Sequence, residues 1–389
     1  MPVALFRYGF RPFFLAVGLS GLILVPWWAG SFAWGVPLGT SWPPTLWHAH
    51  EMLFGFIGAA IAGFLLTAVP SWTGQRGFAG RPLTLLTGVW LLGRLMVSSS
   101  TLWPMAVTAV SDLTFLPALT AMIALPLVRA RNRNTPLLIV LVALWACDVA
   151  FYRALSRGNG PAAQRALFVG IDIVLVLVTV VGGRILPAFT GAALKECGIT
   201  APMRAWPGLT PLAIGSMIAV VITDVEWPES AGAGFAAAVA AAVQLIRLLQ
   251  WRTLKTLRLP IVWVLHLAYA WLPLGLGLKA CALLVGSAMA AFWLHALTIG
   301  ALTTMIFAVM TRAALGHTGR PLVVDSIIVL AYGLLLAAGL VRVFGLAWLR
   351  LGYPVVILVS AAFWSWAFAL FVAVYGPILL SPRVDGKPG

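Results

Sequence analysis

The stretch ALFVGIDIVLVLVTVVGG, residues 166–183, holds a single charged side chain, Asp172. About 20 apolar residues in a helix are enough to cross the hydrocarbon core of a bilayer. The whole chain shares this character, because 62% of its 389 residues are hydrophobic and 9% are charged. Soluble proteins have about 45–50% and 25%. The sequence therefore predicts an all-α, polytopic integral membrane protein and excludes a water-soluble one.

Apolar segments of similar length recur on both sides of that stretch. We predict about twelve transmembrane helices, forming one bundle domain over residues 1–389, at 13–33, 47–72, 82–103, 104–128, 135–156, 163–194, 206–223, 230–251, 260–285, 289–311, 322–345 and 353–380. The first segment follows Arg7 and Arg11 as a secretory signal would. It lacks a small-x-small cleavage site, so we expect a retained helix.

Basic residues between the spans predict the orientation. One side carries sixteen of them, whereas the other carries three: Arg157, Arg165 and Arg350. By the positive-inside rule, both termini of this multi-pass protein are expected to be cytoplasmic. The net charge of +15 reflects this topology rather than nucleic-acid binding. The three scattered cysteines predict no disulfide framework.

Several charged residues lie within the predicted spans, where an unpaired charge costs about 2.5–3.5 kcal/mol. Arg94 and Asp112 each lie nine residues from the turn near Trp103, about 13 Å deep, and we expect them to pair. Asp148 and Asp172 flank another outer turn at similar depth, whereas Arg247 is expected to extend to the inner face. These charges are either structural pairs that fix helix register or parts of a cofactor, anion or proton site.

The chain has only five histidines. His48 and His50 open the second span two residues apart, so their rings point about 200° apart on a helix. One ring can then ligate a metal while the other contacts a neighbouring helix, unless this turn is unwound. The small residues that follow, Gly55, Gly58, Ala59, Ala62 and Gly63, suit either close helix packing or a flat macrocycle.

The other three histidines lie in the second half of the chain. His295 is in the outer half of its span, and His266 is level with Met305 in the inner half. Imidazole and thioether together suit copper(I), although methionine also fills gaps in ordinary helix bundles. His317 lies nearer the cytoplasm. Two loops share the sequence Gly-Arg-Pro-Leu, residues 80–83 and 319–322, which is a weak sign of duplication.

The order of several motifs resembles the NnrS family over essentially the whole chain. These motifs are FRYGFRPFF (6–14), WHAHEMLFGF (47–56), GFLLTAVP (63–70), GGRILP (182–187), HALTIG (295–300) and MTRAALGHTGRP (310–321). The resemblance implies a bacterial inner-membrane protein that carries non-covalent haem b and copper and is associated with the response to nitric oxide. The candidate haem-binding residues are then His48, His50, His295, Arg184 and Lys279, and the candidate metal ligands are His48, His50, His266, His295, His317 and Met305.

The expected function is to bind or process nitric oxide or a related nitrogen oxide within the lipid bilayer, limiting nitrosative stress in denitrification. No catalytic residue is assigned. One alternative is a redox enzyme that reduces nitric oxide at a haem and copper centre, with a quinol or cytochrome as electron donor. A second alternative is a secondary transporter in which Asp148 and Asp172 couple protons to solute movement. No nucleic-acid partner is expected.

Overall fold

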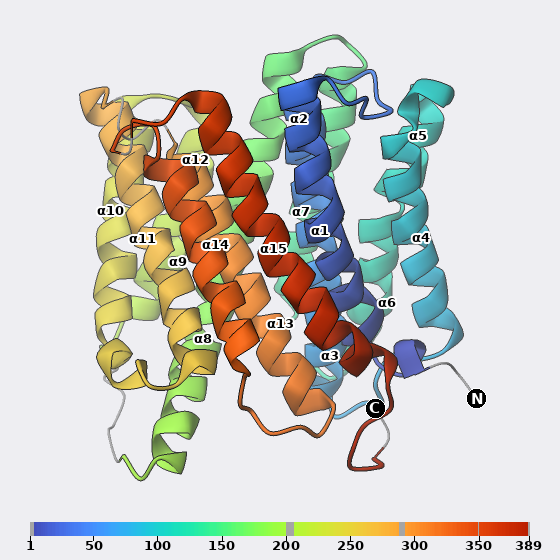
Figure 1. Cartoon of the computed structure of the whole chain (residues 1–389), viewed down its shortest axis with the longest axis vertical. Helices are drawn as coiled ribbons and strands as arrows, with labels where there is room; N and C mark the ends of the chain where they lie inside the picture. Colours follow the sequence, from blue (N-terminus) through green and yellow to red (C-terminus); the bar gives the residue numbers. More distant parts are fainter. Residues whose placement is uncertain (1–3, 200–205, 288–291, 349, 388–389) are drawn as a thin grey trace. The chain divides into compact units, whose positions relative to one another are not determined.

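A computed structural model of the chain describes residues 4–199, 206–287, 292–348 and 350–387. These residues form helices and contain no strand (Figure 1). The chain divides into two compact units, each described here by itself. Unit 1 comprises residues 1–170, 313–321 and 364–389, and unit 2 comprises residues 171–312 and 322–363. The single bundle domain expected from the sequence stays a prediction.

Unit 1 is built from the first seven α-helices and the ends of three others. Its elements are α1 (Phe10–Trp34), α2 (Pro44–His50), the π-helix η2 (Glu51–Ile57), α3 (Gly58–Thr73), α4 (Arg81–Ser98), α5 (Met105–Leu113), α6 (Phe115–Arg129) and α7 (Leu137–Leu155), with the short 3-10 turns η1 (Ala4–Phe6) and η3 (Ser100–Leu102).

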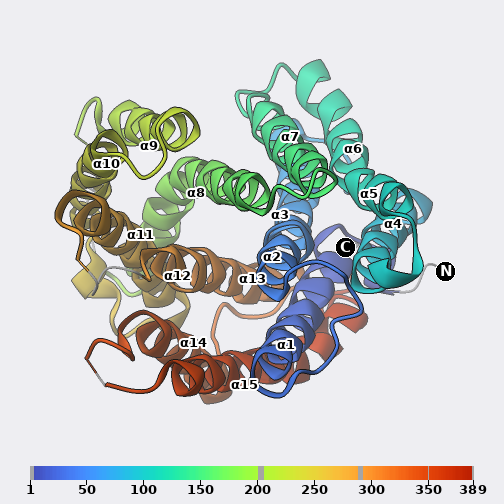
Figure 2. The ribbon, with the colours of Figure 1, turned by 90° about the horizontal axis from the view of Figure 1, so that it is seen from above.

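Unit 2 contains most of α8 (Gly160–Glu196) and the helices that follow it. They are α9 (Leu209–Glu226), α10 (Ala231–Leu249), η4 (Thr253–Thr256), α11 (Pro260–Val285), α12 (Trp293–His295), the π-helix η6 (Ala296–Thr303), most of α13 (Thr304–His317), α14 (Ser326–Phe344) and the first part of α15 (Tyr353–Leu380). Helices α9, α10 and α11 lie side by side (Figure 2).

The predicted membrane architecture is confirmed. Within the described residues, eleven helices are long and apolar enough to cross a membrane. The remaining predicted span, 82–103, is helix α4, which is not among the eleven because Arg81 and Arg94 lower its mean hydropathy. The predicted span 104–128 is divided at Thr114 into α5 and α6. Part of the predicted span 289–311 lies outside the described residues, and its described part continues to His317.

Unit 1 is closed by contacts between α1 and the end of α15. The guanidinium of Arg11 donates hydrogen bonds to the carbonyl oxygens of Leu379, at 2.9 Å, and Ser381, at 2.6 Å. The indole of Trp364 donates to the carbonyl of Gly21 at 2.7 Å. The two bonds from Arg11 satisfy carbonyl oxygens at the C-terminal end of α15, which have no partner within the helix. Arg11, near the start of α1, thereby holds the C-terminal end of α15.

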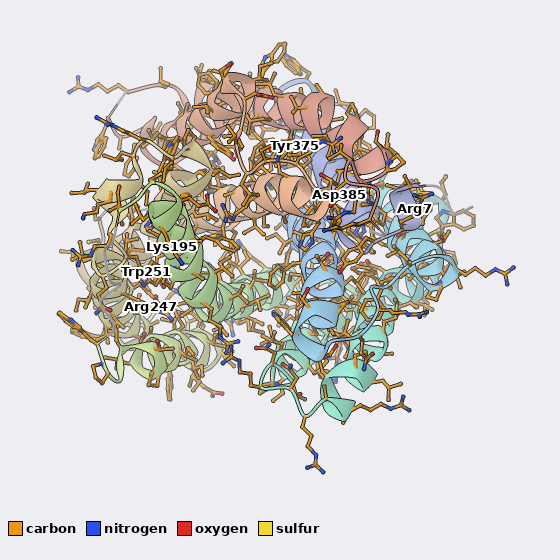
Figure 3. All side chains as sticks on the ribbon, turned by 90° about the horizontal axis from the view of Figure 1, so that it is seen from below. Arg7, Lys195, Arg247, Trp251, Tyr375 and Asp385 are labelled. Atoms are coloured by element: carbon orange, nitrogen blue, oxygen red, sulfur yellow. The ribbon has the colours of Figure 1, made fainter. Side chains whose placement is uncertain are left out.

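Arg247 corrects the expectation that it extends to the inner face. Its side chain is buried, and it donates hydrogen bonds to the Thr179 carbonyl oxygen, at 2.7 Å, and to the Tyr269 hydroxyl, at 3.3 Å. The guanidinium also lies over the Trp251 ring (Figure 3). Gly183 makes room for it, because a Cβ there would lie 1.9 Å from the Arg247 guanidinium. Arg247 is therefore held by buried protein groups and does not reach the aqueous surface.

Two π-helical segments interrupt predicted spans, and each begins directly after a histidine. The segment η2 follows His50, and η6 follows His295. A π-turn displaces backbone carbonyls from their usual partners, and such turns occur often at functional sites. Side chains satisfy a carbonyl in each segment: the Trp90 indole donates to Gly55, and the Thr304 hydroxyl donates to Ile299.

Candidate functional site

His50 lies at the centre of the most polar region of unit 1. It is the last residue of α2 and is fully buried. The rings of Trp42, Phe54, Phe151 and Tyr152 surround it, with centroids 4.7–5.6 Å from the imidazole centroid. This aromatic enclosure excludes water from the imidazole, so its polar contacts must come from protein groups or a bound ligand.

Both ring nitrogens of His50 face carboxylates. Nδ1 lies 3.3 Å from Glu51 Oε1. Nε2 lies 3.1 Å from Asp112 Oδ2 and 3.2 Å from Asp148 Oδ1. Asp112 belongs to α5 and Asp148 to α7, so three separate helical segments converge on one imidazole. One histidine nitrogen and two carboxylate oxygens, all buried, therefore lie within 4.8 Å of one another.

Arg94 supplies the positive charge of this cluster from α4. Its guanidinium forms ion pairs with Glu51 and with Asp112, which confirms the pairing of Arg94 and Asp112 expected from their equal depth. Helices α4 and α5 lie side by side, as Figures 1 and 2 show. Asp112 also accepts a hydrogen bond from the Tyr152 hydroxyl at 2.8 Å. We call the six residues His50, Glu51, Arg94, Asp112, Asp148 and Tyr152 the His50 cluster.

Unit 2 has a second buried charged group that includes a residue absent from the candidate set. Lys279, on α11, pairs with Asp224, on α9, and its ammonium lies 4.9 Å from the centroid of the Trp293 ring. Asp172, on α8, is a buried carboxylate that interacts electrostatically with both Lys279 and Asp224. Asp148 and Asp172, expected at similar depth, thus belong to different units and to different charged groups.

His266 is held by two threonine hydroxyls in unit 2. Its Nε2 lies 2.8 Å from Thr190 Oγ1, and its Nδ1 lies 3.0 Å from Thr253 Oγ1. The ring is buried, as is the side chain of Met305 on α13. A hydroxyl on one nitrogen is the kind of partner that orients a ligating imidazole whose other nitrogen binds a metal.

The other candidate residues are more accessible. The half-buried ring of His48 stacks on Trp28, with centroids 4.3 Å apart, so His48 and His50 have different neighbours, as their spacing predicts. His295 is half-buried beside η6, and Arg184 is exposed on α8. His317 ends α13 and packs against Tyr8 and Phe10. Its carbonyl accepts a hydrogen bond from Arg383, whose guanidinium also holds the pKa of the nearby Asp385 carboxyl below its usual range.

The small-residue face of the second span contacts protein side chains. A Cβ at Gly55 would lie 3.1 Å from the Arg94 side chain, and one at Gly63 would lie 2.8 Å from Phe14. Gly58 faces Phe115. The face that could have received a flat macrocycle is therefore used for close helix packing.

The sequence left the surroundings of three members of these groups undetermined. Asp224, near the end of α9, is not among the charged residues that the sequence places within the spans. Tyr152 was not singled out, although it lies four residues after Asp148 on α7 and so on the same helix face. Glu51 follows His50 directly, and its buried position appears only once α4 is packed against η2.

These features define a class: a polytopic α-helical membrane protein with histidines and charged groups buried inside its helical units. The family described as NnrS protein matches residues 4–383, nearly the whole chain. The chain belongs to the NnrS family, whose members are membrane proteins linked to the nitric oxide response. No curated protein matches the chain.

Proposed function

We propose that this chain binds copper and haem b in the bacterial inner membrane and uses them to capture nitric oxide or a related nitrogen oxide, limiting nitrosative stress. The observation that carries the proposal is the burial of His266 and Met305 inside unit 2 of an NnrS-family protein. A buried imidazole and a buried thioether are donors that copper(I) accepts.

The residues of unit 2 fit copper. Of the two threonines that hold His266, one would keep its hydrogen bond and orient the ring, while the other would release its nitrogen to the ion. Met305 would supply the soft donor. A site of this kind leaves coordination positions for a small diatomic ligand, and a dry surrounding of apolar side chains keeps water from competing for them.

The candidate haem-binding residues differ in how well their surroundings suit haem. His50 does not fit, because both of its nitrogens face carboxylates and the Arg94 side chain fills the space beside Gly55. Either His295, in unit 2, or His48, in unit 1, would hold the haem iron, since both rings are half-buried and so more accessible than that of His50. Arg184 and Lys279 would pair with the propionates, although Lys279 would have to share its ammonium with Asp224. Haem iron and copper(I) would supply the coordination of nitric oxide itself.

The test uses the full-length protein, purified in detergent from cells supplied with haem and copper. We expect a Soret band, bound copper, and a shift of the visible spectrum when nitric oxide is added. His266→Ala should lower copper content and His295→Ala should lower haem content. Arg153→Met, a change at an exposed position of α7, should lower neither. A folded protein that holds neither haem nor copper overturns the proposal.

A second candidate, a proton-coupled secondary transporter, is favoured by one observation. In unit 2 the buried carboxylate of Asp172 interacts electrostatically with the half-buried carboxylate of Asp224, and two carboxylates in one site favour the binding of a proton. Proteoliposomes that contain the protein should then show solute movement driven by a pH gradient, lost in Asp172→Asn and independent of copper. If the protein shows no such solute movement but binds nitric oxide, the transporter candidate is rejected and the first proposal stands.

A further inference from the structure

We propose that His50, Asp112 and Asp148 form a binding site for a non-haem divalent cation of the Mn²⁺, Fe²⁺ or Zn²⁺ kind. This site goes beyond the proposed haem and copper, and it lies wholly within unit 1. The argument rests on the spacing of the donor atoms, on the balance of charge in the His50 cluster, and on the chemistry of the donors.

The donor atoms have the spacing of ligands around a metal ion. His50 Nε2 lies 3.1 Å from Asp112 Oδ2 and 3.2 Å from Asp148 Oδ1. A divalent ion bound at about 2.0–2.2 Å by nitrogen and oxygen ligands separates neighbouring ligands by about 3.0–3.5 Å. One N–H on Nε2 also cannot point fully at two carboxylates, whereas one ion can bind all three atoms.

The charge of the cluster leaves a place for a dication. Three buried carboxylates, of Glu51, Asp112 and Asp148, are opposed by a single permanent cation, Arg94. With a neutral imidazole the cluster carries two uncompensated negative charges inside a water-excluded region, which is costly. A divalent cation brings the sum to zero.

A second feature is the carboxylate at the far nitrogen of His50. The Oε2 atom of Glu51 is buried and has no hydrogen-bond partner, although Glu51 Oε1 contacts His50 Nδ1 and Arg94. A carboxylate on the far nitrogen of a ligating histidine is the usual arrangement that fixes the ring and raises its basicity. Glu51 therefore takes the position of the orienting carboxylate, and Nε2 is left to face the ion. The Tyr152 hydroxyl and the Arg94 guanidinium orient the Asp112 carboxylate in the same way.

The donor set selects the class of cation. Two carboxylate oxygens and one imidazole nitrogen are hard or borderline ligands, which suit Mn²⁺, Fe²⁺ and Zn²⁺ and provide no soft sulfur for copper(I). Cys147 precedes Asp148 on α7, but it does not belong to the group of converging donors. Three protein ligands leave further coordination positions, as catalytic metal sites have.

The experiment measures binding of Mn²⁺ to the full-length protein in detergent after treatment with a chelator, using the loss of the free-ion electron paramagnetic resonance signal. We expect one Mn²⁺ per chain, displaced by an equal amount of Zn²⁺ because Zn²⁺ binds such ligands more tightly. Pulsed measurements should detect one imidazole nitrogen at the bound ion. Excess copper(I) should leave Mn²⁺ in place.

Asp148→Asn removes one charged ligand and should weaken Mn²⁺ binding at least about tenfold. Loss of a residue that only orients a metal ligand already weakens metal binding by about 10–100-fold, so loss of a ligand should weaken it at least as much. Asp172→Asn is the matched control, since Asp172 is a buried aspartate of unit 2, and it should leave Mn²⁺ affinity unchanged. Equal affinity in the two variants overturns the proposal. If Asp148→Asn does not fold, the unmodified protein decides: absence of stoichiometric Mn²⁺, or of the nitrogen signal, overturns it as well. Haem and copper content, measured on the same samples, report separately on the proposed function.

Discussion

Arg94 is the residue of unit 1 whose loss should cost most, because one guanidinium serves two buried carboxylates. Arg94→Met leaves Glu51 and Asp112 without a cation, and breaking a buried ion pair in this way costs about 3–5 kcal/mol. Asp112→Asn keeps the shape of the side chain and an oxygen that accepts from Arg94 and Tyr152. It should cost about 1–3 kcal/mol, the value of a hydrogen bond to a charged group.

The double variant Arg94→Met with Asp112→Asn tests whether the two side chains interact or whether each change destabilises the protein independently. When Arg94→Met is combined with Asp112→Asn, no charged Asp112 is left unpaired. The cost of the double variant in unfolding free energy should therefore fall below the sum of the two single costs by about 0.5–3 kcal/mol. Some cost remains because Glu51 is still without a cation, so adding Glu51→Gln should recover more stability. The free energy of unfolding is measured by titration with dodecyl sulfate in mixed micelles, followed by tryptophan fluorescence.

Arg153→Met is the control for loss of an arginine from a span, because Arg153 is exposed. It should change the free energy of unfolding by no more than about 0.5 kcal/mol. The reasoning is refuted if Arg94→Met is no more harmful than Arg153→Met. Strictly additive costs of Arg94→Met and Asp112→Asn would contradict it too.

Three further predictions concern unit 2 and the topology. Gly183→Ala should destabilise the protein by about 1–3 kcal/mol, because the added Cβ would displace Arg247 from two buried hydrogen bonds. Gly191→Ala, on the same helix, is the control: its Cβ meets no atom within 4 Å, so the change should be neutral or stabilising by up to about 1 kcal/mol. Thermal unfolding of the two variants measures the difference. Lys279→Met should be partly rescued by adding Asp224→Asn, since the second change removes the charge left unpaired; an equal or lower yield of folded double variant would contradict the pair. A C-terminal alkaline phosphatase fusion should be inactive and a green fluorescent protein fusion bright, because basic residues place the C-terminus in the cytoplasm; the opposite pattern would reverse the predicted orientation.

The sequence alone determined where the chain crosses the membrane and which charges share a depth. Hydrophobic length is a local property, so each predicted span has a helix at its place, including α4 with its two arginines. The pairing of Arg94 and Asp112 followed from counting residues on either side of one short turn, because two consecutive helices that meet at a turn place equally distant residues at equal depth.

Only the tertiary structure decided what surrounds each of these residues. Counting along a helix gives depth, but the neighbours of a side chain depend on how helices rotate and pack, which involves residues far apart in the sequence. The imidazole of His50 therefore contacts Asp112 and Asp148. Asp148 and Asp172 belong to different charged groups despite their similar predicted depth. Arg247 found buried partners where Gly183 left space, and Arg94 filled the space beside Gly55. In the π-turn after His50, the Gly55 carbonyl likewise accepts a hydrogen bond from Trp90, a residue of another helix that no local propensity specifies.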